Sequence, residues 1–175
     1  MLKDELIKQS NSFEMLQQIQ KDAKSLYFGI RDFVWSIDSK SDYLEELIVY
    51  LSDFGEELFQ NSQITFKVQK KINNEIKKLP TYWSRQLLLL FKEAMTNTLK
   101  HSKATEVTLF FTLEKDNLII QLIDNGIGFT TNSLKRTNGL NNMQKRVKKI
   151  NGRFDMITNS GTKIIFSGNI NTKIV

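Results

Sequence analysis

Four polar residues near the middle of the chain, Glu93, Asn97, Lys100 and His101, would lie on one side of a helix. At 100° per residue they fall within an arc of about 100°. Carboxylate and amide oxygens are suitable ligands for Mg²⁺, and a lysine ammonium group binds phosphate. An ordinary amphipathic helix with its polar side in water would show the same spacing. The choice between these two interpretations depends on the residues that the rest of the chain brings to this helix.

The other side of this segment is apolar and helically spaced. Its members are Leu87, Leu88, Phe91, Ala94, Met95 and Thr98. Pro80, the only proline, ends a lysine-rich connection, and proline favours the first turn of a helix. We therefore expect a long packed helix after Pro80 that extends to His101.

A second candidate group follows a strand predicted at residues 118–123. It reads Asp124-Asn125-Gly126-Ile127-Gly128-Phe129. A carboxylate at the end of a strand can accept a hydrogen bond from an exocyclic amine such as that of adenine. Glycines there permit positive φ and let a ligand approach the backbone closely. An ordinary turn would give the same short motif. No Gly-Lys-Ser/Thr follows, so this is not a P-loop and phosphates would need other donors.

Gly139, the third candidate, opens a predicted basic helix that should end at Gly152. The free N–H groups and the dipole at a helix N-terminus favour an anion, and Lys100 could add charge from the facing helix. Residues 135–153 hold seven basic side chains and no acidic one. A basic, solvated helix face explains this run more simply than nucleic-acid binding, because no nucleic-acid signature accompanies it.

Composition sets the limits for these interpretations. The 175 residues, 40% hydrophobic and 25% charged, suit one globular domain with a helical extension. The chain has no cysteine, which excludes disulfides and thiolate metal sites, and its single histidine excludes most histidine zinc sites. No apolar run is long enough for a membrane span, and the first residues do not form a signal peptide.

The N-terminal part carries an apolar a/d heptad pattern. Its residues are Leu16, Ile19, Ala23, Leu26, Ile30, Phe33 and Ile37. We expect a helix that Asn11 and Glu14 open as a cap, preceded by a shorter helix at Leu2–Lys8, and therefore a helical hairpin or coiled-coil arm. The narrow apolar seam could pack on a bundle or coiled-coil partner, or on the chain's own globular part.

The remaining elements follow from local patterns. A second helix is expected from Asp42, as its cap, to about Gln60. Strands are expected at 63–70, 106–114, 118–123, 153–157 and 162–168, with a hairpin turn at Asp116-Asn117.

The motifs form a recognisable series. In order they are E-x-x-x-N-x-x-K-H from Glu93, D-N-G-I-G-F from Asp124, N-G-L-x-x-M-x-x-R from Asn138 and S-G-T from Ser160. Together, over about residues 42–170, they resemble the ATP-binding catalytic domain of the sensor histidine kinases of two-component systems. That family belongs to the ATPase group shared with gyrase, mismatch-repair and chaperone proteins. Residues 30–38 also resemble the end of the second dimerisation helix of such kinases.

The resemblance implies roles at the phosphate end of an ATP site. Asn97 would bind Mg²⁺ through its amide oxygen, and Glu93 would act in catalysis by orienting or activating the acceptor. Lys100, together with His101, would reach the phosphates.

At the other end of the site, Asp124 would hydrogen-bond the adenine amine. The further cofactor-binding residues implied by the resemblance are Gly126 and Gly128 around the adenine, Gly139 and Leu140 on the lid side, and Thr162 beside the adenine.

One departure from the family pattern concerns the phosphoacceptor. The family's acceptor histidine lies on the first dimerisation helix, but no histidine precedes Trp35 here, and His101 aligns with the ATP site. Residues 1–38 would then be a remnant of the helical dimerisation region without the acceptor, and residues 42–175 the ATP-binding catalytic domain. We expect a chain that binds ATP and cannot phosphorylate itself.

The expected fold is α+β, a two-layer α/β sandwich with a mixed sheet, after the helical hairpin or coiled-coil arm. The expected function is the catalytic portion of a two-component sensor histidine kinase. It would use ATP and Mg²⁺, transfer phosphoryl to a histidine and then to a response-regulator aspartate, and form a homodimer through the N-terminal helices. The parent would be a membrane-anchored sensor with this part in the cytoplasm, where this part would touch neither membrane nor nucleic acid.

Two alternatives share some of these features. A serine kinase of the anti-sigma-factor type would have the same ATP site, but the heptad arm counts against it. A catalytically silent dimerisation or interaction module would keep only the arm, and the intact Glu93, Asn97 and Asp124 argue against that.

Overall fold

The computed structural model describes residues 2–72, 76–128 and 138–171, so most of the polar loop predicted at 130–138 lies outside the described residues. The chain divides after Ser39 into two units, which are described separately. No helix within the described residues is long and apolar enough to cross a membrane.

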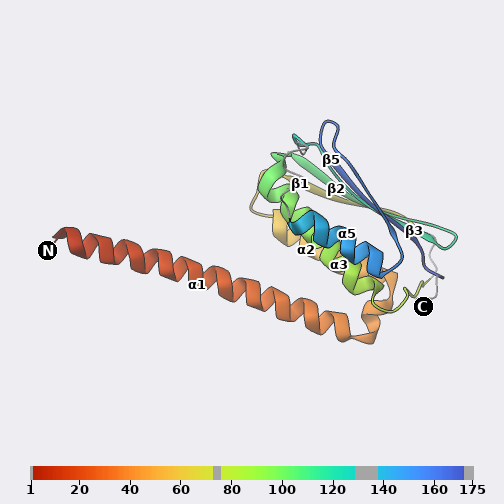
Figure 1. Cartoon of the computed structure of the whole chain (residues 1–175), viewed down its shortest axis with the longest axis horizontal. Coiled ribbons are helices and arrows are strands. Elements are labelled where there is room, and N and C mark those ends of the chain that lie inside the picture. The colour runs from red at the N-terminus through yellow and green to blue at the C-terminus, as the bar shows by residue number, and fades with distance from the viewer. Residues whose placement is uncertain (1, 73–75, 129–137, 172–175) are drawn as a thin grey trace. The chain divides into compact units, whose positions relative to one another are not determined.

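The first unit is one helix, α1 (Leu2–Ile37) (Figure 1). The predicted hairpin is wrong, because the helix runs through Ser10 and Asn11 without a break, and Asn11 is therefore not a cap. Serine and asparagine cost only a few tenths of a kcal/mol each in a helix interior, and neither glycine nor proline is present there to end it. The large seam residues are between 54% and 66% exposed: Leu16, Ile19, Leu26, Ile30, Phe33 and Ile37.

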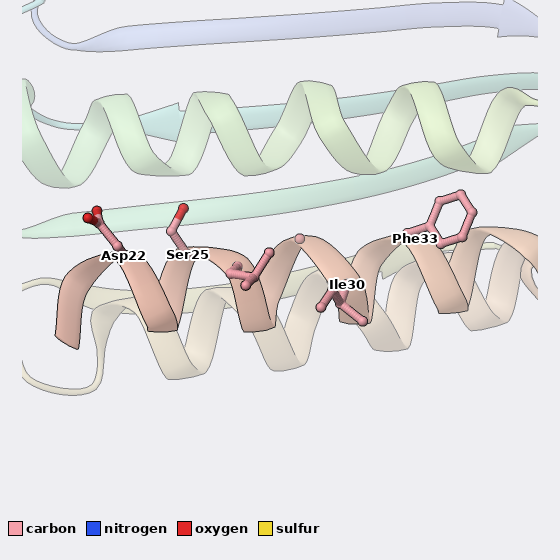
Figure 2. A pocket seen from close by; sticks show the side chains of 6 residues that line it. Asp22, Ser25, Ile30 and Phe33 are labelled. Carbon is pink, nitrogen blue, oxygen red and sulfur yellow. The ribbon is translucent and has the colours of Figure 1, made fainter. Parts of the chain in front are cut away.

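Part of this seam forms a shallow hollow on the surface of α1 (Figure 2). Its lining residues are Asp22, Ser25, Leu26, Gly29, Ile30 and Phe33. All six come from this single helix, so the hollow is a stretch of the exposed apolar seam and not an enclosed cavity.

The second unit is a two-layer sandwich in which helices cover one face of a five-stranded sheet (Figure 1). The strands are β1 (Thr65–Lys71), β2 (Glu106–Glu114), β3 (Asn117–Asp124), β4 (Arg153–Ile157) and β5 (Thr162–Asn169). Their order is β1-β2-β3-β5-β4. β1 runs parallel to β2 and the other pairs are antiparallel, which confirms the predicted mixed sheet.

The hairpin between β2 and β3 turns one residue earlier than predicted. Glu114 pairs with Asn117, so the two turn residues are Lys115 and Asp116. Lys115 takes the left-handed conformation with φ 58°, and Asn117 becomes the first residue of β3.

The helical layer consists of α2 (Leu44–Phe59), α3 (Trp83–Asn97) and α5 (Asn138–Lys149). Helix α3 packs against both of the others, and its apolar face is fully buried. Helix α2 begins after a 3₁₀ turn (Ser39–Asp42), so the predicted cap at Asp42 is wrong. Such shifts are common at helix ends and leave the packing faces unchanged.

After Asn97 the chain continues as a π-helical turn, η2 (Thr98–Ser102). The prediction of a regular helix to His101 is therefore wrong beyond Asn97. Hydrogen bonds in a π-helix join residues five apart, so the winding is wider than in an α-helix. The α-helical arc holds for Glu93 and Asn97, but it does not place Lys100 and His101.

Candidate functional site

Asp124 ends β3 on the face of the sheet that the helices cover. Side chains alternate along a strand, so Asp124 continues the buried series Leu118, Ile120 and Leu122. Asp124 is only 5% exposed, and it pairs with Thr162 of β5 in the sheet. The strand pattern that builds the core therefore also turns this carboxylate toward the helical layer.

Three donors hold the Asp124 carboxylate. The backbone N–H groups of Gly126 and Thr162 donate to Oδ1 over 2.9 and 3.2 Å. The hydroxyl of Thr98, in η2, donates to Oδ2 over 3.3 Å. A buried carboxylate needs such partners, because burying it without them would be costly. The side chain is therefore fixed in place, and Oδ2 keeps room for one more donor.

The glycines after Asp124 serve the packing of this loop. A Cβ at Gly126 would overlap the backbone carbonyl of Ser102, whose oxygen also accepts the N–H of Ile127 over 2.8 Å. Gly128 has φ 71°, so the predicted positive φ applies there but not at Gly126. Gly161, before β5, has φ 113° and packs directly on the carbonyl of Asp124.

Asn125 ties the same loop to the start of β2. Its Oδ1 accepts the N–H groups of Thr105 and Glu106 over 2.9 and 3.0 Å. Its Nδ2 donates to Oγ1 of Thr105 over 3.0 Å. These bonds occupy both ends of its amide, so Asn125 holds the loop and leaves ligand contacts to its neighbours.

Glu93 and Asn97 meet the N-terminal end of α5. Both side chains are half-buried, and Asn97 Nδ2 donates to Glu93 Oε1 over 3.4 Å. A Cβ at Gly139 would overlap Glu93 Oε1 and lie 3.6 Å from Asn97 Nδ2. The structure therefore brings together three of the predicted residues from α3 and α5. The amide of Asn97 then presents its oxygen as an acceptor.

Lys100 and His101 both have exposed side chains in η2. An exposed lysine can turn toward a bound anion without breaking a packed contact. Leu140, in the first turn of α5, is only 7% exposed and belongs to the core.

Arg146 is half-buried on α5, seven residues and about two turns after Gly139. Burial lowers the pKa of Arg146 from its ordinary value, the charge of Glu93 raises it, and the charge of Arg85 lowers it. The carboxylate of Glu93 thus lies against the backbone at the start of α5 and in the field of a cation on the same helix.

Sequence reasoning gave no site role to Thr98, Gly161 or Arg146. Thr98 was placed on the apolar face of the helix, and that placement is right, since the residue is 5% exposed. The available signal was a hydroxyl on an otherwise apolar face, directly after Asn97.

A magnesium ion with few protein ligands would suit this site. Among the described residues, no group of three or more histidine, aspartate or glutamate side chains could hold a metal. Mg²⁺ usually takes one or two protein oxygens and completes its shell with phosphates and water. The amide oxygen of Asn97, beside the carboxylate of Glu93, fits that pattern.

Comparison with known proteins shows a similarity to one family over part of the chain. Residues 84–169 match the family model described as histidine kinase-, DNA gyrase B-, and HSP90-like ATPase. The sensor protein VraS of Staphylococcus haemolyticus is 28% identical over 156 residues, and that of Staphylococcus aureus strain COL is 29% identical. Each match covers 86% of this chain but 41% of the relative, so the chain spans less than half the length of these curated relatives.

Solved structures show the same fold. The histidine kinase AdeS of Acinetobacter baumannii superposes with a TM-score of 0.64 over 90% of this chain and 84% of its own, at 12% identity. The histidine kinase domain of the blue-light activated kinase EL346 of Erythrobacter litoralis gives 0.61 over 71% of this chain and 61% of its own, at 18% identity. Residues 84–169 are therefore similar to the histidine kinase-, DNA gyrase B-, and HSP90-like ATPase family, and the chain shares its fold with solved histidine kinases.

Proposed function

We propose that the second unit binds ATP with Mg²⁺ and supplies its γ-phosphoryl group to a histidine, as the catalytic part of a two-component sensor kinase. The observation that carries this proposal is the buried carboxylate of Asp124. Three donors fix it, and one acceptor position remains on Oδ2. An acceptor held in this way suits an exocyclic amine such as that of adenine.

The phosphate end would lie where Glu93 and Asn97 face the N-terminus of α5. Asn97 would give its amide oxygen to Mg²⁺, and the first N–H groups of α5, near Gly139, would face the phosphates. Lys100, together with His101, would add charge from η2. A bound Mg²⁺ would neutralise charge on the phosphate oxygens during transfer.

In the transfer step, the bond between the γ-phosphorus and the bridging oxygen of ADP breaks, and a P–N bond forms on the acceptor imidazole. ADP leaves, and the imidazole gives up the proton on its other nitrogen. Glu93 would orient the acceptor and take up that proton. Such a reaction depends mainly on positioning and charge neutralisation, which this group of side chains can provide.

The acceptor would lie on a helix that pairs with α1 or precedes it in the parent protein. The exposed apolar seam of α1, including the hollow in Figure 2, supports a second copy as its partner. The phosphoryl group would then pass to an aspartate of a response regulator. We place this chain in the cytoplasmic part of a membrane-anchored sensor, as a homodimer through α1.

The test of the ATP site is a titration with a non-hydrolysable ATP analogue and Mg²⁺. Asp124→Ala should abolish measurable binding, because the acceptor for the amine is lost. Asp124→Asn, which keeps the size of the side chain, guards against a merely unfolded variant and should also bind weakly. Asp53→Ala, an exposed carboxylate on α2, is the matched control. Equal affinities for wild type and both Asp124 variants would refute the site.

Self-labelling tests the role of the missing acceptor. His101 is the only histidine of the 175-residue chain, and the proposal places it beside the phosphates and not as the acceptor. The chain alone should therefore incorporate no acid-labile phosphate from ATP. Adding a dimerisation segment that carries a histidine should restore labelling. Acid-labile phosphate on the chain alone, lost in His101→Gln, would contradict the proposed role of His101 beside the phosphates.

A further inference from the structure

Two threonines two residues apart make different hydrogen bonds. The hydroxyl of Thr96 donates back along its own helix to the carbonyl of Lys92 over 2.7 Å, a local bond common in helices. The hydroxyl of Thr98 instead crosses from η2 to the sheet and donates to Oδ2 of Asp124. Thr98 therefore joins the helical layer to the carboxylate of Asp124, at the end of the proposed ATP site that would hold the base.

The position of Thr98 is set from several directions by η2. Its carbonyl accepts the hydroxyl of Ser102 over 2.7 Å, and that hydroxyl accepts the N–H of Ala104 over 3.0 Å. The carbonyl of Ser102 accepts the N–H of Ile127. The π-helical turn and the loop after Asp124 are thus joined by the bond from Ile127 to Ser102 as well as by the Thr98–Asp124 contact.

The bond also determines what Asp124 can offer to a ligand. A carboxylate has about four acceptor positions on its two oxygens. Within the described residues, the N–H groups of Gly126 and Thr162 take those of Oδ1, and Thr98 takes one on Oδ2. One direction on Oδ2 remains, and only a donor can use it.

We propose that Thr98 is a positioning residue for base recognition, which holds Asp124 so that it presents one acceptor direction to an exocyclic amine. This inference rests on the proposed ATP site and adds a determinant of its specificity. Asn97 and Thr98 are consecutive residues whose side chains reach different partners, Glu93 and Asp124. Because these two residues are adjacent in the backbone, they fix the spacing between the base end of the site, at Asp124, and the phosphate end, at Glu93 and Asn97.

Replacing Thr98 by valine keeps the shape and removes the donor. Only the donors to Oδ1 would then hold the carboxylate. A buried acceptor without its partner either binds a water molecule or lets the side chain rotate. The exocyclic amine would lose a fixed acceptor. A ligand without that amine would lose almost nothing, since it never used this direction.

The experiment compares ATP with the purine nucleoside triphosphate that lacks the exocyclic amine, each titrated with Mg²⁺ against the 175-residue chain. Thr98→Val should weaken ATP binding about threefold to tenfold, which is less than a short hydrogen bond to a charged group would give, because this bond is long. The amine-free analogue should change less than about twofold. ADP should weaken by the same factor as ATP, because the effect lies at the base end.

Two further variants separate positioning from general damage. Thr98→Ser restores a hydroxyl and should recover most of the ATP affinity, while Thr96→Val removes a hydroxyl that does not face Asp124 and should leave it unchanged. Equal losses for ATP and the amine-free analogue, or no recovery by serine, would overturn the inference. If Thr98→Val does not fold, the ratio of the two affinities in Thr98→Ala decides in the same way. Failure of the wild type to bind ATP would refute the proposed function itself.

Discussion

The two ends of the candidate site are built differently. At the base end, three hydrogen bonds hold the Asp124 side chain, a further bond joins its loop to η2, and Asp124 is 5% exposed. At the phosphate end, Glu93 and Asn97 are half-buried and share one long bond of 3.4 Å, while Lys100 is exposed. The fold completes the first end by itself, whereas the second leaves acceptors and charges for a ligand to organise.

This difference separates stability from binding. Substitutions at the base end should damage the fold and nucleotide affinity together, because the same bonds serve both. Substitutions at the phosphate end should change affinity or metal dependence and leave unfolding nearly unaffected. The variants below test that division, beginning with the largest expected effect.

Gly126→Ala should have the largest effect. The new Cβ would overlap the backbone carbonyl of Ser102, which cannot move without disturbing η2. We expect the free energy of unfolding to fall by about 1–3 kcal/mol, as for overpacked sites, together with loss of ATP binding. Thermal unfolding and analogue titration measure the two quantities on the same sample.

Asp53→Ala, at an exposed position on α2, is the control and should leave both quantities unchanged. A Gly126→Ala variant that unfolds and binds like the wild type would mean that the base end is not held by this contact.

Asn97→Ala should separate binding from stability. The amide oxygen that would face Mg²⁺ is lost, so ATP affinity in the presence of Mg²⁺ should fall on the order of tenfold or more, while affinity in EDTA should change little. The unfolding midpoint should stay near the wild-type value, because the bond to Glu93 is long and half-exposed. Asn61→Ala, at an exposed position after α2, is the control. An equal loss with and without Mg²⁺ would remove Asn97 from the metal site.

The same contrast explains which features could be predicted from the sequence. The apolar run of β3 and the helical spacing of α3 are local patterns. They placed Asp124 at the end of a buried strand and Glu93 on the polar side of a packed helix. The mixed sheet followed from a family resemblance and was confirmed. The continuous α1 was missed, because a sequence that could cap a helix at Asn11 is also compatible with a helix interior.

Contacts between distant segments could not be predicted from local sequence patterns. The bond from Thr98 to Asp124 depends on the register of β3 against a π-helical turn, and no periodicity announces a π-helix. For Gly126 the sequence suggested freedom for positive φ or for close approach of a ligand, but its constraint in the fold is the nearby carbonyl of Ser102. Such requirements appear only when the two elements are placed together in space.

Lys100→Met should have a smaller effect, confined to the phosphate end. An exposed ammonium group acts on phosphate mainly through a screened charge, so ATP affinity should fall about twofold to fivefold at low salt and less at high salt. Lys103→Met removes the same charge three residues away, from another exposed side chain, and should have a weaker effect. Identical salt-dependent losses in both variants would mean that Lys100 acts only through the overall positive potential and makes no specific contact with the phosphates.

Glu93→Gln should cause only a small loss of stability, measured by thermal unfolding without nucleotide. Burial lowers the pKa of Arg146 and the charge of Glu93 opposes that shift, so removing the carboxylate leaves Arg146 less well compensated. Because both groups are only half-buried, the loss should stay below about 1 kcal/mol. When folding lowers the pKa of a basic group, the free energy of unfolding is reduced by a constant amount at every pH well below that pKa. The reduction becomes smaller only as the pH rises through the pKa of the folded state. The difference between Glu93→Gln and wild type should therefore stay constant between about pH 6 and pH 9, where arginine is charged in both states. A difference that grew to several kcal/mol would show that the phosphate end, like the base end, is part of what holds the fold together.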